Sequence, residues 1–291
     1  MGTSKSFGGA KGTTPLIPSW LPSDEANPFL PDINPILPRK DDIGDAPKEK
    51  PIVTPSTVIP GNNSRFKQPR TNFTRYASSS GKDSAALKNG LSSYVKKSYG
   101  GAKQASARMS ASKTTARKLA SFFIDVSKQG FQATLQKYNL SKLQKLSLEQ
   151  ACDALADEFC KFDGKIDTAI SRDAFIFTMQ ELENANMLDK LEKPDDATIL
   201  FMLKNFMALS IKNRLIEDVG QSIFLSDKEP ATIQSMETQI TDYIKMTVED
   251  AIIKFQEEFI ILDLMNEIDN LYESSYQMLE LIANEEKEEQ L

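Results

Sequence analysis

The chain has 291 residues, enough for one large domain or two ordinary ones, and a formal net charge of -6. It contains no histidine and only two cysteines, which excludes Ser-His-Asp and Cys-His catalysis and any histidine-containing metal site. It also lacks an apolar run of membrane-spanning length and an apolar signal core at its N-terminus. These absences predict a soluble, cytoplasmic protein with no membrane partner.

Residues 1–63 are predicted to form a flexible, proline-rich N-terminal tail. Twelve of the 14 prolines lie between Pro15 and Pro69, and prolines at this density block helices and favour extended backbone. Apolar side chains such as Trp20 occur along the segment, and on an extended backbone they are suited to docking into a groove of another protein surface. Two interpretations stay open and are compatible: the tail docks on a partner, or it lies on the protein's own helical body.

Residues 64–118 form a strongly basic segment, with 13 Lys and Arg against one acidic residue, whereas residues 119–291 carry 16 basic and 33 acidic residues. Short helices are predicted over 83–97, capped by Asp83 or Ser84, and over 103–120, separated by Gly100 and Gly101. The candidate basic patch comprises Arg65, Arg70, Arg75, Lys96, Lys97, Arg108 and Arg117.

Two roles fit the basic segment. Its cations and interleaved aromatic residues would suit nucleic acid, with phosphates neutralised and bases stacked on the rings. The competing interpretation is that the segment packs against the acidic helices that follow it, which would satisfy both charges within the chain. The sequence does not choose between them.

One motif in this segment resembles a phosphate-binding loop. The stretch SSSGKDSAAL is similar to the SGGxDS loop of ATP pyrophosphatases, although Ser80 stands where the first glycine would be. Such a loop needs a buried strand before it and a helix after it, so that backbone N–H groups converge on the anion. The preceding TNFTRYA does not have a strand pattern, and we therefore interpret the motif as a helix N-cap.

From Leu119 onward, apolar residues recur with helical periodicity and no alternating strand pattern is present. The first helical stretch is LASFFIDVSKQGFQATLQKY, and the second is SLEQACDALADEFCKF, which opens with Ser147 and Gln150 as a capping box. A third helix is predicted near 168–186. Pro194 and the two following aspartates start a fourth helix, and 232–246 and 247–283 supply two more. The predicted fold is all-α: an acidic helical bundle over 119–291, preceded by the basic helical segment and the proline-rich tail.

The bundle offers no self-sufficient active site. Cys152 and Cys160 lie two helical turns apart in an apolar-periodic stretch and are predicted to be buried, reduced thiols. Carboxylate pairs such as Asp153 and Asp157 are typical of a solvated acidic helix face. We therefore predict no catalytic residue, no metal ion and no cofactor, and we expect that the protein is not an enzyme.

Several stretches together resemble a known family. They are the MGTS start, the block PLIPSW, the stretch RFKQPRTNF, and YVKKSYGGAKQASARM. Over residues 1–25 and 65–118 the chain is similar to the QatB family of bacterial Qat anti-phage defence systems. The resemblance implies a subunit without assigned catalysis, accompanied by a QueC-like enzyme, an ATPase and a TatD-like nuclease.

The resemblance implies a specific use for the N-terminus. MGTSKSFGG matches an N-myristoylation pattern, but one acyl chain alone anchors weakly and bacteria generally lack the transferase. QueC-type enzymes instead use ATP to activate a deazaguanine carboxylate for attack by an amine. Gly2, exposed after removal of Met1, is the predicted acceptor of that group. The predicted partner-binding residues are Thr3, Ser4, Pro15, Leu16, Pro18, Trp20, Phe29 and Leu30.

Overall fold

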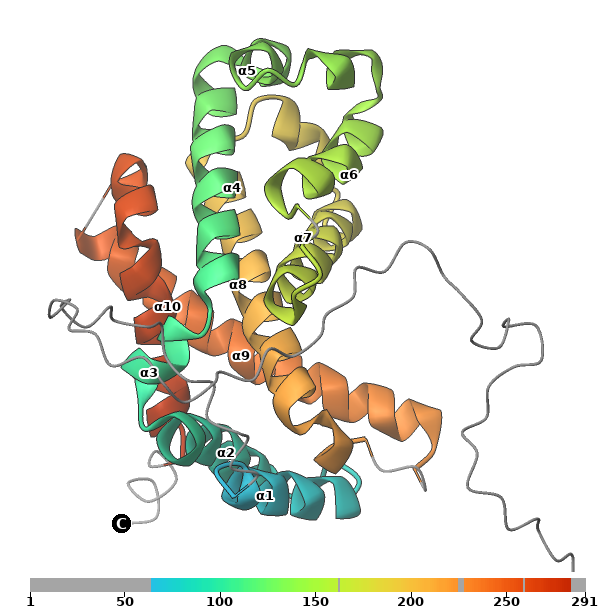
Figure 1. Cartoon of the computed structure of the whole chain (residues 1–291), viewed down its shortest axis with the longest axis vertical. Helices are drawn as coiled ribbons and strands as arrows, with labels where there is room; N and C mark the ends of the chain where they lie inside the picture. Colours follow the sequence, from blue (N-terminus) through green and yellow to red (C-terminus); the bar gives the residue numbers. More distant parts are fainter. Residues whose placement is uncertain (1–63, 162, 225–227, 259, 284–291) are drawn as a thin grey trace, which may run out of the picture. The chain divides into compact units, whose positions relative to one another are not determined.

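The computed structural model describes residues 64–161, 163–224, 228–258 and 260–283, which all belong to one unit, Val58–Leu291 (Figure 1). The predictions for the tail, residues 1–63, lie outside the described residues. Within the described part every regular element is helical and no strand occurs, which confirms the predicted all-α class.

The basic segment contains more helix than the sequence predicted. Its elements are α1 (Lys67–Ser78), α2 (Ser84–Ser93), the π-helix η1 (Tyr94–Tyr99), α3 (Ala102–Ala107) and the first half of α4 (Ser110–Gln129). The first of these, α1, was not predicted, because its apolar face is narrow and its other positions are polar. The predicted helix over 103–120 is two helices, interrupted at Arg108 and Met109.

The rest of the described chain forms longer helices. They are α5 (Phe131–Lys137), α6 (Leu148–Phe159), α7 (Ile166–Asn184), α8 (Asp196–Val219), α9 (Pro230–Glu258) and α10 (Leu264–Leu281), and short 3-10 turns such as η3 (Leu188–Glu192) lie between several of them. The capping box at Ser147 is present, and the Asp195 carboxylate caps α8 by accepting from the Thr198 N–H at 2.8 Å. Both helix starts were predicted from these residues.

The predicted helix start at residue 247 is wrong. α9 runs without interruption from Pro230 to Glu258, and the real break precedes α10. The letters TVED resemble a helix start, but the Thr247 hydroxyl donates to the Ile244 carbonyl one turn back, at 2.8 Å. Ile244 and Val248 are both buried, so the apolar face of the helix continues through this point.

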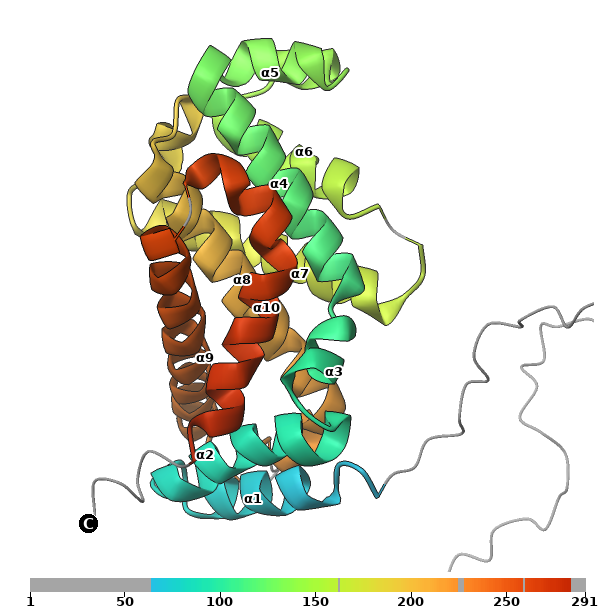
Figure 2. The same ribbon diagram turned by 90° about the vertical axis from the view of Figure 1, so that its left-hand side faces the viewer.

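One continuous core joins the basic segment to the acidic helices. α8 packs against α4, α7 and α9, and α10 packs against α2, α3, α4 and α9. Figures 1 and 2 show α1 and α2 side by side, near the end of α10. Fully buried rings come from both parts of the chain, including Phe73, Tyr76, Phe122, Phe206 and Tyr272. Folding of the basic segment is therefore coupled to that of the bundle.

Gly90 allows the closest approach between the first two helices. It lies inside α2, where glycine is normally unfavourable, but a methyl group there would meet ring carbons of the buried Phe73 at 3.0 Å. The absence of a side chain therefore serves packing between α1 and α2.

We expect G90A to lower the free energy of unfolding by about 1–3 kcal/mol, because the added methyl group overpacks the contact with Phe73. At an ordinary helix-interior site the same change would stabilise by about 0.5–1 kcal/mol. Urea denaturation followed by circular dichroism measures the effect. In an F73L background the cost should shrink, and stabilisation by G90A alone would contradict the packing argument.

Candidate functional site

The predicted partner-binding residues and the acceptor Gly2 all lie in the tail, outside the described residues. The structure does describe the basic segment from Ser64 onward, and with it every residue of the candidate basic patch. The candidate site is therefore the surface formed by α1, α2, η1 and α3, together with the groups beneath it.

The carboxylate of Asp218 on α8 lies beneath this surface and accepts two tyrosine hydroxyl groups. Tyr94 donates to its Oδ2 atom at 2.8 Å, and Tyr99 donates a short hydrogen bond to the same atom. The two tyrosines are five residues apart, and in an α-helix they would point about 140° away from each other. The i→i+5 turn of η1 places both on one side of the helix.

A guanidinium group and a ring complete this cluster. Arg70 on α1 donates to the main-chain carbonyl of Asp218 at 3.2 Å, and its guanidinium carbon lies 5.6 Å from the centre of the Phe66 ring. Phe66 is buried and makes an edge contact with Tyr99 at 6.0 Å between ring centres. We call these five residues, Phe66, Arg70, Tyr94, Tyr99 and Asp218, the Asp218 cluster. It fastens α1 and η1 to α8.

The Asp218 cluster stabilises the neutral form of its tyrosines. Burial raises the pKa of Tyr99 to about 12, and the neighbouring Asp218 carboxylate contributes to the same rise. Burial also raises the pKa of Tyr94 well above its ordinary value, with smaller contributions from Tyr99 and Asp218. These hydroxyl groups are therefore hydrogen-bond donors at cell pH, and their role is structural.

Three arginines of the candidate basic patch are used within the protein. Arg70 belongs to the Asp218 cluster. Arg75 pairs with Asp83 at 2.8 Å, and Arg117 pairs with Asp269 on α10. Lys113, outside the predicted patch, joins the same Asp269 carboxylate at 3.1 Å. Part of the basic segment thus packs against acidic helices, as one of the two interpretations expected.

The remaining residues of the patch point outward or stack on a ring. Lys97 and Arg108 are exposed and Lys96 is half-buried. Arg65 is exposed and its guanidinium carbon lies 4.5 Å from the centre of the Phe66 ring. Lys103 on α3, which was not among the predicted patch residues, is exposed as well. The structure therefore distinguishes cations that pair within the chain, including the exposed Arg75, from cations without such a pair.

The aromatic residues of the segment are mostly core. Phe66, Phe73, Tyr76 and Tyr94 are all buried, and only Tyr99 is partly exposed. Buried rings offer no face on which a base could stack, so a nucleic acid would meet cations without the stacking platforms that single-strand binders use.

The stretch SSSGKDSAAL spans the turn between α1 and α2 and includes the first residues of α2. The Asp83 carboxylate accepts from the Ala86 N–H at 2.8 Å and is the N-cap of α2, which confirms the helix-cap interpretation. A helix, α1, stands where a phosphate-binding loop would need a strand.

The cysteines are buried, reduced thiols, as predicted. Burial raises the pKa of Cys152 to about 12 and also raises that of Cys160, so neither is a thiolate at cell pH. In the part of the chain that the structure describes, no group of three or more acidic or cysteine side chains could hold a metal ion.

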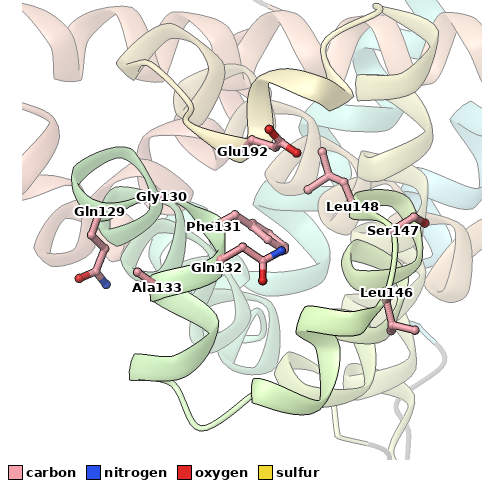
Figure 3. Close-up of a pocket in the computed structure, with 9 residues that line it drawn as sticks. All are labelled: Gln129, Gly130, Phe131, Gln132, Ala133, Leu146, Ser147, Leu148 and Glu192. Atoms are coloured by element: carbon pink, nitrogen blue, oxygen red, sulfur yellow. The ribbon is translucent and has the colours of Figure 1, made fainter.

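A surface groove of about 570 Å³ lies away from the basic segment, beside α5 and the start of α6 (Figure 3). Its lining combines Phe131 and Leu148 with polar side chains and one carboxylate, Glu192 on η3. The hydroxyl of Ser147 is engaged in the capping box of α6. With the Ser147 hydroxyl used as a cap, the lining offers a mixed polar and apolar surface that suits contact.

We expect D218A to lower the free energy of unfolding by about 2–4 kcal/mol, because two largely buried tyrosine hydroxyl groups lose their acceptor. Urea denaturation measures the loss. The matched control is D242A at an exposed position of α9, which should change stability by less than about 0.5 kcal/mol. In a Y94F/Y99F background the cost of D218A should fall; an undiminished cost would show that the hydroxyl groups do not carry the effect.

We expect stability to fall between pH 10 and 12. Tyr76 and Tyr99 have pKa values raised to about 12, mainly by burial, whereas an exposed tyrosine has a pKa of about 10. A folded-state pKa above the unfolded value means that the unfolded chain releases protons first, so stability is intact below pH 10 and is lost as pH rises.

Absorbance at 295 nm, recorded with circular dichroism during an alkaline titration, tests this expectation. Ionisation of the buried tyrosines should coincide with loss of helix. Complete tyrosine ionisation near pH 10 in a protein that remains folded would refute it.

Comparison with known proteins gives one match and two negative results. No curated protein and no solved structure matches the chain. One family model does match, described as Qat anti-phage system associated protein QatB, over residues 100–279. Among the described residues, no helix is both long and apolar enough to cross a membrane. Because that match covers more than half of the chain, the protein belongs to the QatB family and has its role in the Qat anti-phage system.

Proposed function

We propose that this protein is a non-catalytic subunit of the Qat defence complex and the protein substrate of its QueC-like enzyme. The observation that carries the proposal is membership of the QatB family, together with the resemblance of the N-terminal stretch to that family. The described residues support a non-catalytic role, since the cysteines are buried and the cluster of tyrosines and charges is structural. Chemistry would then come from the partner.

The reacting group in this proposal is the α-amine of Gly2, freed by removal of Met1. An α-amine has a pKa of about 7.7–8.0, so an appreciable fraction is neutral and nucleophilic at cell pH. It attacks the carbonyl carbon of a deazaguanine carboxylate that the partner has activated with ATP as an acyl-adenylate. An amide bond forms, AMP leaves with the electrons of the broken C–O bond, and the amine loses one proton.

The tail residues have separate roles in this scheme. Gly2 has no side chain to obstruct a narrow channel, and the enzyme would recognise the side chains of Thr3 and Ser4 next to it. Proline-stiffened segments lose little conformational entropy on docking. The strip Pro15, Leu16, Pro18 and Trp20, followed by Phe29 and Leu30, would therefore hold the tail on the enzyme. The system's ATPase and TatD-like nuclease are further candidate partners.

Intact-mass analysis of the protein coexpressed with the QueC-like enzyme tests the proposal. We expect one deazaguanine adduct, placed on Gly2 by mapping the N-terminal peptide. G2P should abolish the adduct, because proline has a hindered secondary amine, whereas K5R, the matched control at the nearest lysine, should keep it. Unmodified protein, an adduct retained by G2P, or an adduct on Lys5 would refute the proposal.

A purely structural subunit is the first competing function, and deletion of residues 2–12 separates it from a substrate. A scaffold should still assemble and defend without those residues, whereas a substrate should assemble but lose defence.

The second competing function is a nucleic-acid adaptor, favoured by the exposure of Lys97 and Arg108 and the partial exposure of Lys96. It requires binding that weakens steeply with salt and that is lost when these cations are neutralised. Arg117, paired with Asp269, would contribute little.

A further inference from the structure

Three lysines of η1 and α3 remain after the internal ion pairs are assigned, two of them exposed and Lys96 partly exposed. Lys96 and Lys97 lie on η1, and Lys103 lies on α3. None of these three forms an ion pair with any residue that the structure describes. The single acidic residue of the segment, Asp83, is engaged with Arg75. We call Lys96, Lys97 and Lys103 the lysine face.

The last turn of α10 ends beside the lysine face. The Glu280 carboxylate accepts from the main-chain N–H of Ala102, directly before Lys103, at 3.1 Å. The main-chain carbonyl of Glu280 accepts from the Ser92 hydroxyl at 2.6 Å, and Ser92 precedes Lys96 by four residues. Both views show α10 running down to the end of α2, with α3 beside its lower part (Figures 1 and 2). The chain therefore leaves α10 close to the lysine face.

The sequence that follows α10 is complementary in charge. Residues 284–291 read NEEKEEQL, with four glutamates and one lysine. A chain advances at most about 3.3–3.6 Å per residue, so six residues beyond Ala283 span roughly 20 Å. The glutamates are thus tethered within reach of the lysine face, and a short tether gives an effective concentration on the order of millimolar.

We propose that the glutamate segment 285–289 docks on the lysine face of the same chain. A single exposed ion pair stabilises little, so the docking depends on several pairs acting together and is screened by salt. The lysine face is then a masked surface: an anionic partner must displace the glutamate segment before it can bind there. A tethered acidic segment is favoured over nucleic acid as the occupant because the neighbouring aromatic rings are buried.

Zero-length carbodiimide cross-linking followed by peptide mass spectrometry tests this docking. The reagent joins a lysine amine to a carboxylate only where the two are in contact. In the full-length protein at low salt, we expect cross-links between Glu285, Glu286, Glu288 or Glu289 and the lysine face. They should fall several-fold between about 0.05 M and about 0.5 M salt, because the Debye length shortens roughly threefold. An equal mixture of ¹⁴N- and ¹⁵N-labelled protein distinguishes contacts within a chain from contacts between copies.

Internal and variant controls make each outcome decisive. The Lys204–Glu249 pair, at 3.0 Å in the structure, is the positive control for the reaction. Lys145, Lys161 and Lys193 are exposed lysines elsewhere and serve as negative controls. The combined variant E285Q/E286Q/E288Q/E289Q should remove the cross-links. Absence of cross-links from the glutamate segment while Lys204–Glu249 is joined, equal joining to the control lysines, or mixed-isotope products would overturn the proposal.

Discussion

The arrangement of the basic segment depends on one carboxylate acting as a shared acceptor. Asp218 receives hydroxyl groups from Tyr94 and Tyr99, and its main-chain carbonyl receives Arg70. A carboxylate that leaves water stabilises a fold only if its oxygens find donors, and these donors come from residues more than one hundred positions earlier in the chain. The π-turn of η1 follows from this constraint, because an ordinary α-helix would direct only one of the two tyrosines toward Asp218.

Contacts within the chain divide the cations of the segment into two classes. Arginines are prominent in the engaged class, where a planar guanidinium can stack on a ring or form fixed hydrogen bonds, as Arg70 does at Phe66 and as the exposed Arg75 does with Asp83. Lysines are prominent in the other class, where a strongly hydrated ammonium group remains in water. The charge contrast along the sequence is therefore only partly neutralised within the fold. The lysine face is therefore suited to an acidic partner, and it lies near the end of α10, which the glutamate-rich residues 284–291 follow in the sequence.

The candidate site could be predicted only in part. The identity of Asp83 and Ser147 as caps followed from local rules, because a cap binds the backbone two or three residues away. The roles of Asp218, Asp269 and Gly90 did not follow, since each depends on a contact between helices that are distant in sequence or tightly apposed. Residues 247–250 show the converse error: a local start signal was overridden by an apolar face that continued through it. The family match also falls mainly on helices in which no distinctive motif was found.

Periodicity and composition are properties of single segments, so the amino-acid sequence was sufficient to predict a helical protein. It also showed that histidine chemistry is absent and that positive charge is concentrated in residues 64–118 and negative charge in residues 119–291. It also contained the family resemblance, through short blocks of letters that can be compared without any knowledge of the packing. Which arginines pair within the chain, which lysines are exposed and where α10 ends became known only from the folded arrangement of the helices. Those properties depend on which surfaces meet, and burial of one shared core brings together residues that no local rule connects.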